Sequence, residues 1–423
     1  MKKKFITFIA DLRFAIFLLL LISLFSILGT IIEQDQPIEI YKINYPLNKP
    51  IIGFLSWDKI MFFGLDHLYK TSWFLTLILM FGLSLISCTF LQQIPSIKIA
   101  RQYQFFRTVK SFNKLKLSTV LLNSNINKFI YQLKILDYSL FQQKNILYCY
   151  KGIIGRIGPI FVHVSIIIML FGTLFSSLTG FKSQEIVPKN EIYHIQNIFN
   201  NNKLTQIPNI SIRVNDFWIT YTKKKTISQF YSDISILDNK GKEIKHKVSF
   251  VNSPTIYKNI YYYQTDWNLI GIRLSQSLNQ SIEYPLIRNF DNENKIWLTW
   301  IFDNQNLTKG FITIIDNLQG YGSLYNNNGT LLGNIELNEN LLNSNSLKFI
   351  DIISSTGLQI KSDPGIPIIY TGFLFLMINT LISYITYSQI WLIQKDNKIF
   401  IGGNTTRATF EFELEFFRLI KSI

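Results

Sequence analysis

The residue of this sequence best suited to chemistry is His163, which lies in an otherwise uncharged apolar stretch at 157–178. An ionisable side chain in the hydrocarbon of a bilayer costs about 3 kcal/mol or more unless it has a partner, so it marks a candidate functional site. A neutral imidazole there can ligate a metal such as haem iron, relay a proton or hydrogen-bond a neighbouring helix. The structural alternative is a histidine satisfied by Ser or Asn of another span, with Asn379 as the candidate partner.

The three other histidines are weaker candidates. His67 lies six residues before Trp73, near the expected start of a second span. It is either a second ligand at the opposite membrane face or an interfacial polar residue. His194 and His246 lie among lysines and polar residues, and we expect both to be solvent-exposed.

No motif of a self-contained enzyme accompanies these histidines. The sequence has no GxSxG, no Walker-type Gly-Lys-Ser loop, no HExxH and no His/Cys cluster with zinc spacing. We therefore expect no catalytic residue, and no metal contact beyond an iron that His163 could reach through haem.

The elements that position His163 are membrane spans. Segments at 14–32, 71–91, 157–181 and 366–393 lack Lys, Arg, Asp and Glu, and about 20 apolar residues suffice to cross the hydrocarbon core. The sequence therefore predicts a four-span membrane protein. The first run is too long for a cleaved signal peptide and no small-residue cleavage site follows it, so we interpret 1–32 as an N-terminal tail and a retained span.

The distribution of charge predicts the orientation. Segment 92–156 carries eleven basic residues and one acid, Asp137, which is +10 of the net +15, whereas 33–70 and 182–365 are nearly balanced. The positive-inside rule places both termini and the basic connector 92–156 on the inner side, and 33–70 and 182–365 on the outer side. The excess of basic residues is thus a topology signal, and a nucleic-acid partner is not expected.

The remaining segments predict a mixed α+β protein. The outer domain 182–365 has short alternating runs separated by turn signals such as Asp238-Asn-Lys-Gly, which favour a β sandwich or barrel-like domain. The inner connector predicts a small strand–helix–strand unit, with the helix at 126–136, which the tail 394–423 completes. The two cysteines, Cys88 and Cys149, form no CxxC pair and are expected to be buried thiols facing a reducing compartment.

Sequence motifs in several blocks, in the same order, resemble those of one family. The chain resembles ResB-type (CcsB) c-type cytochrome biogenesis proteins of system II, in their plastid and cyanobacterial form. The resemblance covers nearly the whole length. The blocks include Ser26-Ile-Leu-Gly-Thr, Ser87-Cys-Thr, Gln93-Ile-Pro, Gly158-Pro-Ile-Phe-Val-His-Val-Ser, Asp216-Phe-Trp-Ile-Thr-Tyr, Val251-Asn-Ser-Pro, Tyr263-Gln-Thr-Asp-Trp and Ser355-Thr-Gly-Leu-Gln-Ile-Lys-Ser-Asp-Pro-Gly.

The resemblance implies a role in delivering haem and attaching it to apocytochromes. Family members act with a CcsA (ResC) membrane protein that carries a tryptophan-rich haem-handling motif, which this chain lacks. The resemblance implies that His163 is an axial ligand of transiently bound haem b, paired with a histidine of that partner. It also implies a non-catalytic subunit, apocytochrome substrates such as those of cytochrome f and cytochrome c6-type, and a plastid thylakoid membrane with a lumenal large domain. A cyanobacterial thylakoid or plasma membrane is the alternative location.

Two other functions remain open at this point. The chain could be a structural chaperone of apocytochrome, or of its partner, that never binds haem and in which His163 only holds helices together. It could also be a transporter with His163 as a relay, but the spans lack further buried ionisable residues, which disfavours this reading.

Overall fold

The computed structural model describes residues 2–48, 50, 55–115, 117–122, 126–201, 204–223, 226–277, 280–289, 296–303, 306–341, 347–395 and 398–421. They fall into two compact units: Met1–Ser177 with Gly365–Ile423, and Leu178–Pro364. The first is mainly helical and carries one small sheet, and the second is built of strands. The expected membrane α+β class is confirmed.

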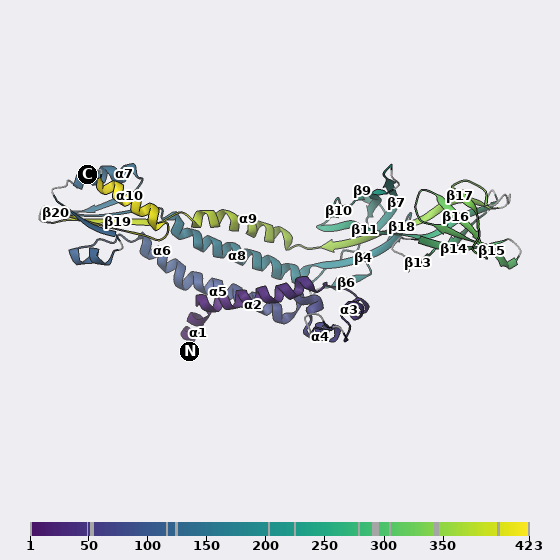
Figure 1. The fold of residues 1–423 in the computed structure, drawn as a ribbon, viewed down its shortest axis with the longest axis horizontal. Coiled ribbons are helices and arrows are strands. Elements are labelled where there is room, and N and C mark those ends of the chain that lie inside the picture. Colours follow the sequence, from purple (N-terminus) through teal and green to yellow (C-terminus); the bar gives the residue numbers. More distant parts are fainter. Residues whose placement is uncertain are drawn as a thin grey trace. The chain divides into compact units, whose positions relative to one another are not determined.

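Within the described residues, four helices are long and apolar enough to cross a membrane (Figure 1). The second is the longest, because α5 continues through the π-helical turn η2 and helix α6 to give one 30-residue rod. Short helices flank the spans. The spanning segments are α2 (Leu12–Ile31), α5 (Ser72–Cys88) with η2 (Thr89–Gln93) and α6 (Ile94–Arg101), α8 (Ile154–Thr179) and α9 (Ile366–Ser383). The short helices are α1 (Lys2–Ile9), α3 (Ile38–Asn44), α4 (Trp57–Phe63), η1 (Leu65–Lys70) and η3 (Val109–Lys114).

The fourth span is shorter than the sequence predicts. Helix α9 ends at Ser383, and the last part of the expected span, 366–393, forms strand β19 (Ser388–Lys395) instead. Helix α9 and the part of β19 up to residue 393 are both uncharged, and a short apolar run does not distinguish a buried strand from the end of a buried helix. The strand is favoured here because pairing on both edges buries Trp391 and Leu392.

Helices α8 and α9 lie side by side with glycine at their closest approaches (Figure 1). A Cβ atom on Gly158 would lie 2.5 Å from Ser383 Cα, and one on Gly372 would lie 2.7 Å from Met169 Cγ. Small residues at such positions let two helix backbones pack closely in a membrane. The pair is further joined by a hydrogen bond from Asn379 Nδ2 to Ser165 Oγ, at 3.0 Å.

Gly158→Ala is expected to loosen this helix pair. The new methyl group meets the backbone of α9, which cannot move as a flexible side chain does, so the free energy of unfolding falls by about 1–3 kcal/mol. Thermal aggregation of the detergent-solubilised full chain measures the effect. Gly82→Ala is the matched control, since its Cβ would meet only Leu170 Cδ1 at an ordinary 3.7 Å. An equal midpoint for both variants would contradict the close approach.

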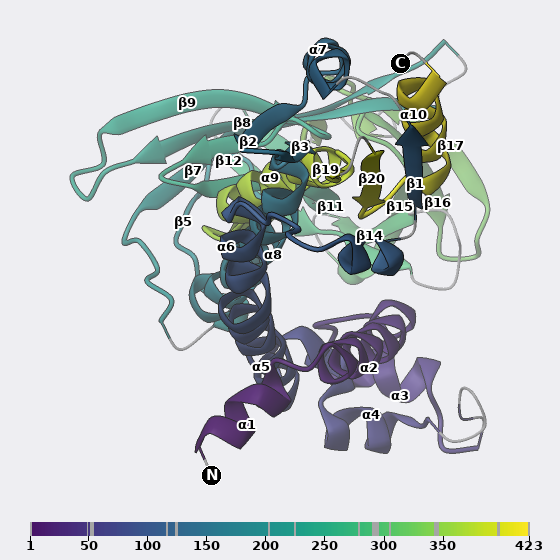
Figure 2. The same ribbon diagram turned by 90° about the vertical axis from the view of Figure 1, so that its left-hand side faces the viewer.

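A small sheet lies at the end of α8 and α9 (Figure 1). Its order is β1-β20-β19-β3-β2, entirely antiparallel. Helices α7 and α10 cover one of its faces (Figure 2). The predicted strand–helix–strand unit and its completion by the tail are confirmed, with β2 as an additional strand. The elements are β1 (Leu117–Leu122), α7 (Ile126–Ile135), β2 (Ser139–Gln143), β3 (Ile146–Lys151), β20 (Lys398–Thr405) and α10 (Thr409–Lys421).

Cys149 of β3 is fully buried beneath α7 and α10. Burial raises the pKa of its thiol well above the ordinary value, since the thiolate is poorly solvated there. The thiol therefore stays protonated at neutral and mildly alkaline pH, and only the thiolate is a good nucleophile.

In a Cys88→Ser background, Cys149 is accordingly expected to resist maleimide between pH 7 and pH 9 in the native protein. It should react fully once the protein is unfolded in denaturant. Mass spectrometry of the labelled full chain reads both states. Rapid labelling of the native protein, at a rate that rises between pH 7 and pH 9, would show that the small sheet is not closed over this residue.

The second unit consists of three sheets in the described residues, which confirms the predicted β-rich domain. The long strands β11 and β18 pair along most of their lengths, and their side chains contribute to two hydrophobic cores. One end packs against β7 and β8 around Ile212 and Tyr262, and the other packs against β14–β17 around Trp297. This is layered, sandwich-like packing.

The strands of this unit are β4 (Phe181–Pro188), β5 (Ile192–Tyr193), β6 (Ile198–Asn201), β7 (Ser211–Tyr221), β8 (Ile227–Leu237), β9 (Glu243–Phe250), β10 (Thr255–Tyr257), β11 (Ile260–Ser277), β12 (Gln280–Pro285), β13 (Ile287–Asn289), β14 (Ile296–Asp303), β15 (Asn306–Ile315), β16 (Tyr321–Asn326), β17 (Leu331–Glu336) and β18 (Lys348–Ser362).

Candidate functional site

His163 is half-buried on α8 and faces the second span, where both of its ring nitrogens have partners. Nδ1 lies 3.0 Å from Thr89 Oγ1 and Nε2 lies 3.1 Å from Gln93 Nε2. Thus two polar side chains of the π-helical turn η2 hold one imidazole of α8.

The hydrogen-bond network assigns the tautomer of this imidazole. The Thr89 hydroxyl donates to the carbonyl oxygen of Leu85 at 2.8 Å, so its oxygen is free to accept from His163 Nδ1–H. The Gln93 amide then donates to Nε2, which carries the lone pair. A metal-ligating histidine commonly donates its other ring N–H in this way, which fixes the ring and leaves one nitrogen available as the ligand.

Local backbone geometry explains why Thr89 and Gln93 both reach the ring. The N–H of Ile94 bonds to Thr89 O, five residues back, which is a π-helical hydrogen bond. Pro95 has no N–H to continue the α-helical ladder. Single π-turns are frequent at functional sites, because they redirect side chains from an otherwise regular helix.

The sequence analysis did not predict Thr89 and Gln93 as site residues. The available signal was two polar residues four apart, just before a proline at the end of an apolar segment. The expected structural partner, Asn379, was wrong: its Nδ2 bonds Ser165 Oγ at 3.0 Å and reaches Phe161 O at 3.4 Å. Ser165 is fully buried and accepts the hydrogen bond from the Asn379 amide. The hydrogen-bond partners of His163 lie on the second span instead.

The structure places His67 in η1, at the other end of α5, with Nδ1 2.8 Å from Asp66 Oδ2 and a side chain that is 48% exposed. Between His67 and η2 lie the 17 residues of α5, about 25 Å at the α-helical rise. The two histidines therefore cannot ligate the same iron. A ligand role for His67 at the opposite face stays a prediction.

The two histidines of the β-rich unit are exposed, as expected. His246 Nε2 lies 2.5 Å from Asp233 Oδ1 across the β8–β9 pair. Among the described residues, no three His, Cys, Asp or Glu side chains are grouped to hold a metal ion.

The fold and the site together define a multi-span membrane protein that holds a single imidazole, in one defined tautomer, between two spans. Comparison with protein families identifies the family: the chain belongs to the ResB-like family, whose model matches residues 12–294 and 319–417.

Relatives match over the full length. The "Cytochrome c biogenesis protein Ccs1" of Phaeodactylum tricornutum is 64% identical over 421 residues, 100% of each chain. The "Cytochrome c biogenesis protein CcsB" of Trichormus variabilis is 43% identical over 429 residues, covering 100% of this chain and 93% of the relative. The role expected from the sequence motifs, a factor in cytochrome c biogenesis of plastid and cyanobacterial type, is confirmed.

One solved structure, "Cytochrome c Heme Lyase CcmF", aligns with 73% of this chain and 30% of its own. Its TM-score is 0.25 at 8% identity, and so low a similarity supports no argument about fold or function.

Proposed function

We propose that this chain presents haem b for attachment to apocytochromes c, with His163 Nε2 as an axial ligand of the iron. The observation that carries the proposal is the pair of contacts made by the His163 ring, from which its tautomer is assigned. Nδ1–H is committed to Thr89, so the lone pair lies on Nε2, the nitrogen that a metal can use.

The residues around the ring have separate roles in this proposal. Thr89, held by Leu85 O, fixes the ring and keeps its proton on Nδ1. Gln93 satisfies Nε2 when no ligand is bound. A neutral hydrogen bond contributes only about 1 kcal/mol net, so the Gln93 amide can be displaced at small cost. Haem itself supplies the iron and the carbons that become bonded to cysteine.

The second axial ligand is proposed to come from a CcsA-type partner. Within the described residues, no other histidine of this chain lies at the site, and the chain acts as a non-catalytic subunit. The proposed location is a plastid thylakoid membrane with both termini stromal and 182–365 lumenal, which the +10 charge of the 92–156 connector supports.

One observation favours a second candidate function, that of a structural chaperone. Both ring nitrogens of His163 already have hydrogen-bond partners. A purely structural role, in which the imidazole joins α8 to the second span, therefore accounts for the same contacts. In that case haem never contacts the ring, and the chain would brace its partner or the apocytochrome.

Haem content of the purified complex tests the proposal. The full chain is copurified with its partner as wild type, His163→Ala and Asn379→Ala, and haem per complex and the Soret spectrum are measured. Loss of most of the haem in His163→Ala alone is expected. Asn379→Ala is the control, since it removes a polar contact of α8 without touching the imidazole. Unchanged haem content and spectrum in His163→Ala would leave the chaperone function instead.

A further inference from the structure

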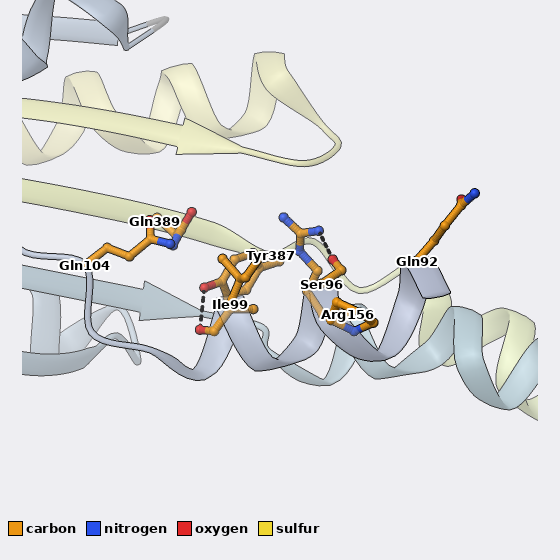
Figure 3. A pocket seen from close by; sticks show the side chains of 9 residues that line it. Gln92, Ser96, Ile99, Gln104, Arg156, Tyr387 and Gln389 are labelled. Atoms are coloured by element: carbon orange, nitrogen blue, oxygen red, sulfur yellow. Dashed lines mark hydrogen bonds between the residues drawn. The ribbon is translucent and has the colours of Figure 1, made fainter. Parts of the chain in front are cut away.

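Two adjoining cavities lie where the second span, the start of α8 and the end of α9 meet. One is about 260 Å³ and the other about 330 Å³, and Gln92, Ser96 and Arg156 line both. Arg407 lines the smaller one. Figure 3 shows the larger one, with the Arg156 guanidinium reaching Ser96 beside Tyr387.

The cavities carry two positive charges and no acidic lining residue. Arg156 Nη1 donates to Ser96 Oγ at 3.0 Å and its guanidinium lies 5.2 Å from the Tyr387 ring centroid. Arg407 Nη1 donates to Ser383 O at 2.9 Å. Within the described part of the chain, neither arginine forms an ion pair, so both retain hydrogen-bonding capacity for an anion.

Two buried polar atoms at the smaller cavity have no hydrogen-bond partner among the described residues. They are Arg156 Nε, a donor, and Gln93 Oε1, an acceptor. A buried polar group without a partner costs about 1–3 kcal/mol, so native structures rarely leave one unsatisfied without a function. The unsatisfied Arg156 donor fits an anionic ligand, whereas the Gln93 acceptor needs a hydrogen-bond donor and does not support one.

The smaller cavity adjoins the candidate haem ligand. Gln93, which lines it, is the residue that donates to His163 Nε2. Arg156 precedes His163 by seven residues on α8, which is about two turns, or about 10 Å, along the same face of the helix. A ligand atom at Nε2 and an anionic group at Arg156 can therefore belong to one elongated molecule.

We propose that Arg156 and Arg407 bind the carboxylates of the haem whose iron His163 ligates. This rests on the proposed function and adds a determinant of which porphyrin is bound, and in which orientation. The cavity volumes are at the lower end for a whole ligand, so they suit a polar edge better than the macrocycle. Paired oxyanion groups are the chemistry that two unpaired guanidinium groups recognise.

The test compares haem with its dimethyl ester, which has the same iron and ring but no carboxylate. The full chain with its partner is stripped of haem and titrated with each, and binding is followed by Soret absorbance. Wild type should prefer haem by about tenfold or more, as expected for charge-assisted hydrogen bonds. The Arg156→Gln/Arg407→Gln variant should bind both within about twofold. Arg101→Gln, which removes an exposed positive charge at the end of α6, should keep the preference.

The outcomes separate this inference from the proposed function. Equal wild-type affinity for haem and ester would overturn the carboxylate site while leaving His163 ligation intact. No Soret change with either porphyrin would overturn both. A lipid phosphate is the other source of an oxyanion, so bound phosphatidylglycerol is also quantified. If wild type retains that lipid, the double arginine variant loses it, and wild type binds haem and ester equally, the cavities bind a lipid headgroup and not haem.

Discussion

A strain carrying His163→Gly is expected to regain assembly of c-type cytochromes when imidazole is supplied in the medium. The substitution removes the ring but keeps Thr89 and Gln93, the two side chains that hold it. Free imidazole has the same two nitrogens, so it can donate to Thr89 and offer the other nitrogen to iron. The initial loss of haem affinity should exceed the roughly 10- to 100-fold typical of residues that only support a ligand. Holocytochrome is measured by haem staining of membrane proteins.

His163→Leu controls for this rescue. Its side chain fills the space of the ring, so imidazole cannot enter and assembly should stay low. A further control is the level of the chain in the membrane, which should be equal in both strains. Rescue of both variants, or of neither at full protein level, would indicate that imidazole acts elsewhere or that the ring has no ligand role.

The two residues that contact the ring are expected to change haem affinity in opposite directions. Thr89→Val keeps the size of the side chain but removes the acceptor for Nδ1–H, which leaves the ring and its proton unfixed. Affinity should fall about tenfold or more. Gln93→Leu removes the donor that competes with iron for Nε2, so affinity should rise by up to about tenfold, the equivalent of one hydrogen bond. Titration of the complex followed by Soret absorbance gives both values.

Thr89→Ser is the matched control, since it keeps the hydroxyl and should bind haem nearly as wild type does. Because haem affinity is expected to fall in Thr89→Val and to rise in Gln93→Leu, a general loss of folding cannot produce the same result. A fall of similar size in both would show that Thr89 and Gln93 stabilise the helix contact and do not tune the ligand.

The spans and the two β-containing regions were predictable because length, charge and alternation report directly on membrane crossing and strand formation. The C-terminal end of the fourth span was not predictable, since nothing in its composition marks where helix α9 ends and strand β19 begins. Its strand state depends on pairing with β20, the next strand in the sequence, and with β3, which lies far away in sequence.

The candidate site shows the same division. His163 was identifiable alone, because an imidazole in an apolar segment is costly without a partner. Its partners were not, since a helical pattern does not reveal which face of one span meets another. The spacing of four places Thr89 and Gln93 on one helix face, but the sequence does not tell that this face meets α8. Asn379 was chosen on residue type, and the buried Ser165 Oγ is its partner instead.

The order of strands in the small sheet also determines when during synthesis this sheet can form. Strands β19 and β20 occupy the middle of the sheet, between β1 and β3, yet they are the last described strands to be synthesised. Until they arrive, β1 and β3 have exposed edges and α7 lacks α10 beside it over the same core. The small sheet can therefore close only after the final span has been made. A chain truncated within that span would therefore leave the pairing edges of β1 and β3 without partners.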